Sequence, residues 1–436
     1  MKTDLLISRP CRLVNRSDQW HDERVMLNKK KPFHLMAKPA GPDCNLACKY
    51  CFYLEKEVLF KEQKIHRMSE EVLETYVKQY CESQNTPEIL FAWQGGEPTL
   101  MGVDFFKKAV ELQRKYSAGR PVQNAFQTNG TLLDNEWCKF LAKEKFLIGL
   151  SIDGPRHIHD KFRVYRGGQP TFDRVMKSLK LMKSHRVDFN TLTCVTRQNA
   201  QYALEIYDFL KGTGSTFLQF IPIIERKPDD ESAKLGLKLA LPPDLLADDN
   251  DDRVMPWTVQ PEQYGQFLVD IFDEWVRNDV GSVFVQIFDV MLNAWMDMPP
   301  PLCVFAERCG DAMIIEHNGD LYSCDHFVYP DFRLGNILDT NMADLAASDQ
   351  QRQFGNDKFD KLPQYCRKCD VFFACHGECP KHRFITTPDG EPGLNWLCAG
   401  YKQFMHHIDP YMRTMAQLIR SQRPAAEIMS MVPPKK

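Results

Sequence analysis

Three cysteines lie on one short loop near the start of the chain, with the spacing Cys-x3-Cys-x2-Cys. They are Cys44, Cys48 and Cys51, and a short apolar run over residues 34–40 precedes them. Thiolates this close in the chain can reach a single metal centre. The stretch constrains the fold strongly, because a strand-like segment must deliver three ligands to one place.

The number of thiolates indicates which centre they bind. Iron–sulfur clusters of the cubane type are normally held by four cysteines, so a three-cysteine loop leaves one iron open to a non-protein ligand. An open iron that chelates the amino and carboxylate groups of S-adenosylmethionine (SAM) is the radical SAM arrangement, in which the cofactor carries the difficult chemistry. The alternative is a structural zinc loop. Zinc sites favour paired Cys-x2-Cys or Cys/His sets, and the next histidine, His66, lies beyond a charged stretch.

Length and charge restrict the class of protein. A chain of 436 residues has room for roughly two or three structural units. The net charge of −3 argues against nucleic acid or a membrane as the main partner. The first thirty residues lack the apolar core of a signal peptide, and no run approaches the roughly 18 apolar residues of a membrane span. We expect a cytoplasmic protein.

The chain has 15 cysteines, and the cytoplasm keeps thiols reduced. Most of them fall into two groups, over residues 44–51 and 303–398, which indicates metal ligands rather than disulfides. We interpret the four isolated ones as ordinary buried thiols: Cys11, Cys81, Cys138 and Cys194.

Apolar runs alternate with amphipathic segments over the first half of the chain. The predicted strands cover residues 34–38, 89–93, 122–127, 146–152, 188–195 and 216–223. The predicted helices cover residues 69–81, 103–116, 134–143, 172–185 and 200–211. Strand–helix repetition every 30 residues or so, roughly, indicates βα units on a parallel sheet. Six such units suit a partial (β/α)6 barrel, and a doubly wound open sheet fits the same pattern.

A break in this rhythm suggests how the α/β chain is divided. Residues 225–256 are rich in Pro, Asp and Lys, and we expect a solvated linker or insertion. Long helices are predicted after it, over residues 261–279 and 283–296. The expected units are an N-terminal extension (1–33), the barrel (34–260), a cysteine-rich domain (261–410) and a C-terminal tail (411–436).

The cysteine-rich domain contains eight cysteines, enough for two closed clusters. Residues 311–327 predict a β-hairpin, because Asn318-Gly-Asp320 separates two apolar runs. Two zinc sites would need the same number of thiolates, but the N-terminal loop favours iron–sulfur clusters. The eight are Cys303, Cys309, Cys324, Cys366, Cys369, Cys375, Cys379 and Cys398.

Several motifs together resemble one known family. They are the loop at residues 44–53, Gln94-Gly-Gly-Glu-Pro98, Gln127-Thr-Asn-Gly130, Gly149-Leu-Ser-Ile-Asp-Gly154 and the eight later cysteines. Over residues 34–410 this set resembles the anaerobic sulfatase-maturating enzymes, which are radical SAM proteins with a SPASM domain. The loop alone indicates the superfamily and the eight cysteines the SPASM group. Phe91-Ala-Trp-Gln94 and Cys324-Asp325 point to sulfatase maturation.

The resemblance implies three [4Fe–4S] clusters and roles for particular residues. Cys44, Cys48 and Cys51 would hold the SAM-cleaving cluster. One auxiliary cluster would be held by Cys303, Cys309, Cys324 and Cys379, and the other by Cys366, Cys369, Cys375 and Cys398. The SAM pocket would be lined by Tyr50, Gly96, Ser151, Arg163 and Ile224. Asp325 would be the catalytic base, with Gln94 and Tyr53 facing the substrate.

Some of these roles also have a physical argument. Glycine after a strand lets backbone approach a ligand closely, as Gly96 would, and the fork of Arg163 suits a carboxylate. Asp325 would feel the charge and desolvation of a neighbouring cluster, which could raise its proton affinity. The alternative is a turn aspartate paired with Arg308 or Arg333. We interpret His326 as a packed or exposed histidine.

The resemblance implies oxidation of one Cys or Ser in an unfolded sulfatase polypeptide to Cα-formylglycine, under anaerobic conditions. The electron donor would be a flavodoxin or ferredoxin. One alternative is another SPASM peptide maturase that forms thioether or carbon–carbon crosslinks. Those often carry an N-terminal peptide-binding domain, for which residues 1–33 are too short. A non-catalytic metal scaffold would leave the Gly-Gly-Glu-Pro and Ser-Ile-Asp-Gly turns without a purpose.

Overall fold

The computed structural model of the protein describes residues 32–61, 64–243 and 253–433. Across these ranges ten strands form one sheet, in the order β10-β9-β8-β1-β2-β3-β4-β5-β6-β7, and β11 pairs with β12 in a separate hairpin. The strands are β1 (His34–Lys38), β2 (Ile89–Trp93), β3 (Val122–Thr128), β4 (Leu147–Ser151), β5 (Phe189–Val195), β6 (Phe217–Pro222), β7 (Phe284–Val285), β8 (Ala312–Glu316), β9 (Asp320–Tyr322), β10 (Arg333–Asn336), β11 (Arg383–Thr386) and β12 (Pro392–Asn395).

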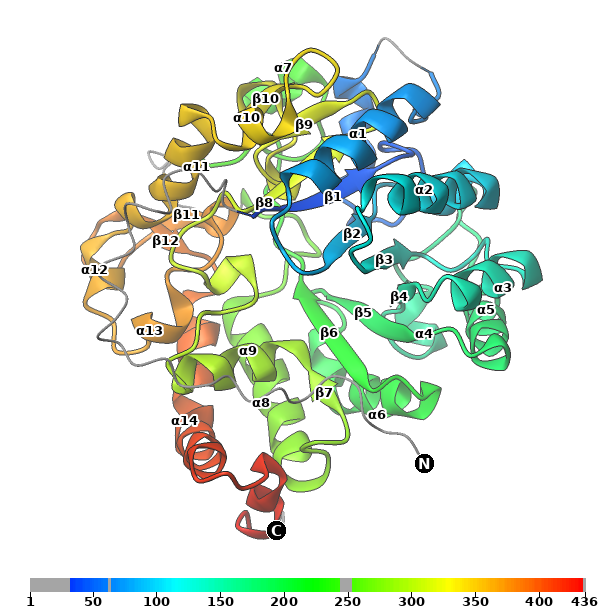
Figure 1. The fold of residues 1–436 in the computed structure, drawn as a ribbon. Helices are drawn as coiled ribbons and strands as arrows, with labels where there is room; N and C mark the ends of the chain where they lie inside the picture. The colour runs from blue at the N-terminus through cyan, green and yellow to red at the C-terminus, as the bar shows by residue number, and fades with distance from the viewer. Residues whose placement is uncertain (1–31, 62–63, 244–252, 434–436) are drawn as a thin grey trace, which may run out of the picture.

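The order of the parallel strands decides between the two predicted architectures. Strands β1 to β6 lie side by side in chain order and all pairs are parallel. A doubly wound sheet reverses its order at a switch point, whereas a barrel winds in one direction. The strands follow an arc with the early helices on its outer side (Figure 1). The partial (β/α)6 barrel is confirmed.

The helices start where their capping residues predict. Ser69 Oγ accepts a hydrogen bond from the N–H of Val72 at 3.2 Å, and Asp134 caps the N–H of Trp137 at 3.0 Å. In the described part of the chain no helix is long and apolar enough to cross a membrane. The helices are α1 (Glu70–Ser83), α2 (Val103–Tyr116), α3 (Asn135–Lys143), α4 (Arg156–His159), α5 (Phe172–His185), α6 (Ala203–Thr213), α7 (Asp230–Leu235), α8 (Pro261–Asn278), α9 (Gln286–Trp295), α10 (Met342–Ala346), α11 (Asp349–Asp360), α12 (Gln364–Arg367), α13 (Phe372–Cys375) and α14 (Cys398–Arg420).

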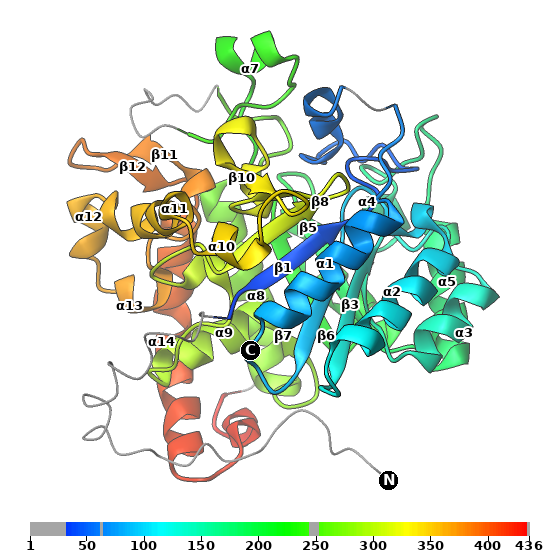
Figure 2. The same cartoon turned by 45° about the horizontal axis from the view of Figure 1, so that its top comes forward.

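The hairpin of the cysteine-rich region is part of the barrel sheet. Strands β8 and β9 form the predicted antiparallel hairpin, and β8 also pairs with β1 in parallel along its whole length. The register places Lys38 opposite Glu316. Strands far apart in the chain are therefore neighbours (Figures 1 and 2), and the segment after β9 lies near the end of β1.

The expected boundary before residue 411 is wrong, because α14 continues through it to Arg420. Pro410 lies inside this helix, although proline normally ends one. The helix packs along α8, where Gly265 and Gly400 face each other. A side chain at Gly400 would collide with the backbone of α8. Ile428, beyond the helix, is buried as well, so the described end of the chain belongs to the core.

The insertion predicted at residues 225–256 folds partly against the barrel. It contains the short helix α7 and packs Leu237 and Leu239 into buried positions. The Glu55 carboxylate, just after the three-cysteine loop, accepts the backbone N–H groups of Lys238 and Leu239 at 2.7 and 2.9 Å. The acidic run at 248–252 lies outside the described residues. The described part of the insertion therefore covers the loop.

Candidate active site

The three-cysteine loop follows β1 and packs against the Gly-Gly-Glu-Pro turn that follows β2. The backbone N–H groups of Gly96 and Glu97 donate to the carbonyl oxygens of Gly41 and Asp43, both at 2.8 Å. A side chain at position 96 would collide with the Asp43 carbonyl, so this close approach requires glycine. Since its N–H is engaged, the group that Gly96 can offer an ammonium ligand is its carbonyl oxygen.

The acid of this turn, Glu97, binds the motif at the end of β3. The Glu97 carboxylate is buried and accepts hydrogen bonds from the Thr128 hydroxyl at 2.7 Å and the Asn129 N–H at 2.8 Å. Asn129 in turn lies 3.7 Å from the sulfur of Cys44. The Gly-Gly-Glu-Pro and Gln-Thr-Asn-Gly motifs are thereby joined at the loop.

The three thiols of the loop affect one another and are protonated when nothing is bound. Burial raises the pKa of Cys44 to about 12, and the Glu97 carboxylate adds to this shift. Burial also raises the pKa values of Cys48 and Cys51. Such thiols become thiolates only with a cationic centre in place, which suits an iron cluster. Among the described residues no three Cys, His, Asp or Glu side chains are arranged to hold a single metal ion.

Four of the five residues predicted to line the SAM pocket lie in segments around β4 to β6 or in the three-cysteine loop, and the fifth, Gly96, lies in the turn after β2. Tyr50 and Arg163 both contact Asp153, with the Tyr50 hydroxyl at 2.5 Å and Arg163 Nε at 3.0 Å. Burial would lower the pKa of Arg163, but the Asp153 carboxylate outweighs it and the net shift is upward. Ser151 ends β4, and Ile224, which is buried, follows β6.

Two residues of this pocket were not assigned from the sequence. Asp153 belongs to the quoted Gly149–Gly154 motif, which was the available signal. Cys194 was interpreted as an ordinary buried thiol; it is a free, half-buried thiol, and its sulfur accepts from Arg163 at 3.5 Å beside the loop. Only its place at the end of a predicted strand could have indicated this. Cys81 and Cys138 are buried as predicted, and Cys11 lies outside the described residues.

The predicted base and the two predicted substrate-facing residues meet at one lysine. Asp325 is ion-paired with Lys38. The Lys38 ammonium nitrogen also lies 3.5 Å from Gln94 Oε1 and 3.8 Å from the centre of the Tyr53 ring. The amide of Gln94 donates to Gln127 at 2.8 Å. The structure therefore brings the three predicted residues together.

Lys38 offsets the effect of burial on Asp325. Burial alone would raise the pKa of its carboxyl, but Lys38, with smaller contributions from His326 and Lys381, lowers it below the usual value. The raised proton affinity expected beside a bound cluster stays a prediction. The alternative pairing is also absent, since Arg333 binds Asp320 at 2.7 Å and Arg308 contacts Asn356. His326 is packed, in edge contact with Phe52.

The eight later cysteines lie in two sets, and their assignment to two clusters stays a prediction. Thiol charges affect one another within two sets. The first quartet is Cys303, Cys309, Cys324 and Cys379. The second quartet is Cys366, Cys369, Cys375 and Cys398, and these four line a single cavity beside Tyr401 and Lys402. Cysteines of the two sets are interleaved along the chain, but each set is gathered in one place in the structure. All the cysteines that the structure describes are free thiols.

A buried arginine lies between the quartets. The charge on Arg383 acts on Cys379 of the first quartet and on Cys366 and Cys375 of the second. Its guanidinium donates to the carbonyl oxygen of Gly377 at 2.8 Å and to neighbouring carbonyls. Burial lowers the pKa of Arg383, and the thiols oppose that shift. Arg383 thus fixes the backbone segment that carries cysteines of both quartets.

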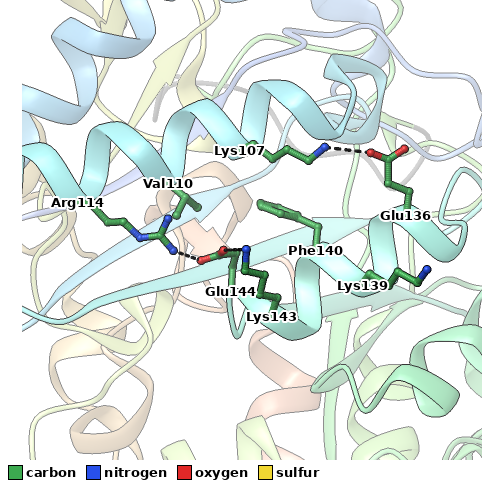
Figure 3. Close-up of a pocket in the computed structure, with 8 residues that line it drawn as sticks. All are labelled: Lys107, Val110, Arg114, Glu136, Lys139, Phe140, Lys143 and Glu144. Carbon is green, nitrogen blue, oxygen red and sulfur yellow. Dashed lines mark hydrogen bonds and ion pairs between the residues drawn. The ribbon is translucent and has the colours of Figure 1, made fainter.

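A groove between α2 and α3 does not belong to the site (Figure 3). Two of its basic side chains are paired within the groove, Lys107 with Glu136 at 3.0 Å and Arg114 with Glu144. None of the predicted site residues lies on these two helices. These ion pairs lie on a solvated face of α2 and α3.

Comparison with protein families identifies both halves of the chain. A family model of the radical SAM superfamily matches residues 39–210. A model of an iron–sulfur cluster-binding domain, SPASM, matches residues 303–370.

Curated relatives decide the family. A serine-type anaerobic sulfatase-maturating enzyme from Bacteroides thetaiotaomicron is 47% identical over 92% of this chain and 95% of its own length. The chain belongs to the anaerobic sulfatase-maturating enzymes. A cysteine-type anaerobic sulfatase-maturating enzyme from Clostridium perfringens is 34% identical over 89% of this chain and 100% of its own length.

Solved structures agree with this assignment. The structure of native anSMEcpe with bound AdoMet and Cp18Cys peptide has a TM-score of 0.76 and 34% identity, covering 89% of this chain and 99% of that one. Streptococcus suis SuiB bound to the precursor peptide SuiA has a TM-score of 0.55 at 15% identity, covering 80% of this chain and 72% of that one, and shows a shared fold only. The predicted family and the radical SAM and SPASM organisation of the sulfatase-maturating enzyme are confirmed.

Proposed function

We propose that this sulfatase-maturating enzyme oxidises one Cys or Ser of an unfolded sulfatase polypeptide to Cα-formylglycine. The observation that carries the proposal is the parallel pairing of β1 with β8. It joins the start of the three-cysteine loop to the hairpin that precedes Asp325, so that a radical source and a proton acceptor lie at one end of the sheet. The names of the relatives support the same reaction.

The donor set supports three [4Fe–4S] clusters. Cys44, Cys48 and Cys51 leave one iron for SAM, and each quartet closes its own cluster. When bound, these groups supply the radical that removes a hydrogen atom from the target Cβ and the acceptor for the electron left behind. SAM itself would be held by Tyr50, Gly96, Ser151, Arg163 and Ile224.

The protein's own side chains position the target and handle its proton. Gln94 and Tyr53 would face the target residue beside Asp325, since both contact the Lys38 ammonium that is paired with Asp325. The Asp325 carboxylate would accept the thiol or hydroxyl proton of the target, because the Lys38 ammonium lowers the pKa of its carboxyl and about a fifth of its side chain, 21%, is accessible. For a Cys target, hydrolysis of the thioaldehyde then gives the aldehyde.

We also propose a cytoplasmic location and a flavodoxin or ferredoxin as the electron donor. The three-cysteine loop borders a cavity under the insertion, lined by Cys48, Cys51 and Trp257. Reduction with either carrier, compared with dithionite, tests this partner: a carrier that supports no turnover is not the donor.

The function is tested with two peptides. The protein is reconstituted anaerobically with iron and sulfide, and SAM, reductant and a peptide with a Cys-x-Pro-x-Arg core or its Ser counterpart are added. Mass spectrometry should show an aldehyde on the target residue together with 5′-deoxyadenosine. The ratio of the two yields gives the residue preference. Deoxyadenosine with a crosslinked peptide would indicate the other SPASM maturases, and no deoxyadenosine would exclude the radical SAM chemistry.

A further inference from the structure

Lys38 is a buried lysine at the heart of the candidate site that the sequence motifs do not include. It is the last residue of β1, directly before the turn that leads into the three-cysteine loop. Its side chain is only 1% exposed. Lysine is almost never buried unless it is paired, so the partners of the Lys38 ammonium indicate its role.

Each contact of the Lys38 ammonium is made with a residue of the site. It is ion-paired with Asp325, approaches the side-chain oxygen of Gln94 at 3.5 Å and lies over the Tyr53 ring at 3.8 Å. Asp325 comes from the cysteine-rich region, Gln94 follows β2, and Tyr53 follows the loop. One cation thus connects three separate segments of the chain.

The counter-ion of Lys38 is Asp325 rather than the acid opposite it in the sheet. Glu316 faces Lys38 across the β1–β8 ladder, but its carboxyl accepts from the Tyr53 hydroxyl. Burial raises the pKa of Glu316, and the opposing effect of Lys38 does not cancel that shift. Glu316 therefore fixes the hydroxyl end of Tyr53 while Lys38 contacts its ring.

The other basic side chains near Asp325 have partners of their own. Lys381 pairs with Glu225 at 2.6 Å, and Lys56 lies over the Tyr329 ring at 3.2 Å. His326 lies with Nδ1 3.4 Å from the sulfur of Cys379. Among the described residues, Lys38 is the one direct ionic partner of the Asp325 carboxylate. A variant without Lys38 would lose this partner.

We propose that Lys38 is a positioning residue for the oxidation: its ammonium holds the Asp325 carboxylate, the Gln94 amide and the Tyr53 ring around the space that the target residue enters. This role rests on the proposed function. Lys38 acts through Asp325, because its own side chain is buried while 21% of the Asp325 side chain is accessible.

The test compares Lys38→Met with Lys38→Arg in the reconstituted holoenzyme. The substrate peptide carries deuterium at the target Cβ, so hydrogen removal is read as deuterium in 5′-deoxyadenosine and product as aldehyde. In Lys38→Met we expect deuterium transfer within about threefold of wild type but an aldehyde-to-deoxyadenosine ratio about 10- to 100-fold lower, as for a misplaced catalytic group. Lys38→Arg keeps a cation and should recover most of the ratio.

Lys56→Met is the matched control, because Lys56 is equally buried and lies over another ring. It should leave the ratio unchanged. Iron content is measured for every variant, to separate positioning from loss of clusters. In an Asp325→Asn background, Lys38→Met should lower the ratio no further, since residues that act as a unit are not additive. Thermal unfolding of the wild type, Lys38→Met, Asp325→Asn and the double variant should likewise show that the two substitutions are not additive.

The outcomes separate the two proposals. A wild-type enzyme that makes no aldehyde overturns the proposed function and this role with it. A wild-type enzyme that makes aldehyde while Lys38→Met keeps the normal ratio overturns only the role of Lys38. An equal fall in Lys38→Met and Lys38→Arg, with full iron content, also contradicts it, because the charge would then be irrelevant.

Discussion

Each cysteine quartet contains one Cys-Asp dipeptide, and the two dipeptides have opposite surroundings. In Cys324-Asp325 the carboxylate is paired with Lys38, whose side chain is 1% exposed. In Cys369-Asp370 the carboxylate is 68% exposed and pairs with His406 at 2.8 Å on the surface. The same dipeptide thus carries a carboxylate of the candidate site in the first quartet and a solvent-exposed carboxylate in the second. The neighbouring strand β1 makes the difference.

The largest effect expected from this comparison is the loss of a ligand in the first quartet. Cys324→Ala and Cys369→Ala should each lose about four irons per chain. Cys324→Ala should abolish aldehyde formation, because it also releases Asp325, whereas Cys369→Ala should retain more product per deoxyadenosine. Iron analysis and the peptide assay measure both. Equal residual activity would mean that the quartets are equivalent for the chemistry.

Exchange of the acids themselves comes next. Asp325→Asn should lower aldehyde formation about 10²- to 10⁴-fold, the range of a general base, with SAM cleavage retained in part. Asp370→Asn is its matched control and should stay within about twofold, since surface substitutions rarely matter. Full product from Asp325→Asn would exclude the essential base.

Removal of the cationic partners should separate the two carboxylates in stability. Lys38→Met leaves Asp325 without its partner and should cost about 3–5 kcal/mol in the free energy of unfolding. His406→Ala, at the exposed pair, should leave the melting temperature almost unchanged. Thermal unfolding of the reconstituted protein checks this, and similar losses in the two variants would contradict the comparison.

The smallest effect concerns His326, whose Nδ1 lies 3.4 Å from the Cys379 sulfur. Polar contacts to cluster sulfurs tune reduction potential. His326→Phe should therefore lower the potential of the first cluster and leave that of the second unchanged. A redox titration followed by electron paramagnetic resonance resolves the two. Equal shifts would indicate a general loosening of the domain.

The sequence predicts local structure well where a short apolar run has clear ends. Strands β1 and β2 and helices α2 and α5 have the predicted limits. Local signals also predicted the hairpin of β8 and β9. They could not predict that β8 joins β1, because a single sequence carries no information on which distant strands pair. The full length of α14 was not predicted for another reason: Pro410 lies inside this helix, and proline normally ends one.

The same limit explains which site residues were found. Cysteines and glycine turns have fixed spacing, so the resemblance transfers them residue by residue. Lys38 has no such signal, because a lysine at the end of a strand is usually solvated and its partner Asp325 lies in the last third of the chain. Asp153 and Cys194 act through Arg163, at the ends of different strands.

The parallel pairing of β1 with β8 also sets an order of events during synthesis. Chains generally fold from the N-terminus as they are made, and the three-cysteine loop emerges early. Its neighbouring strand, with Asp325 just beyond it, is made only after the whole barrel. A nascent or truncated chain therefore has the three-cysteine loop but lacks Asp325, the group proposed to accept the substrate proton. Completion of the chain couples the two.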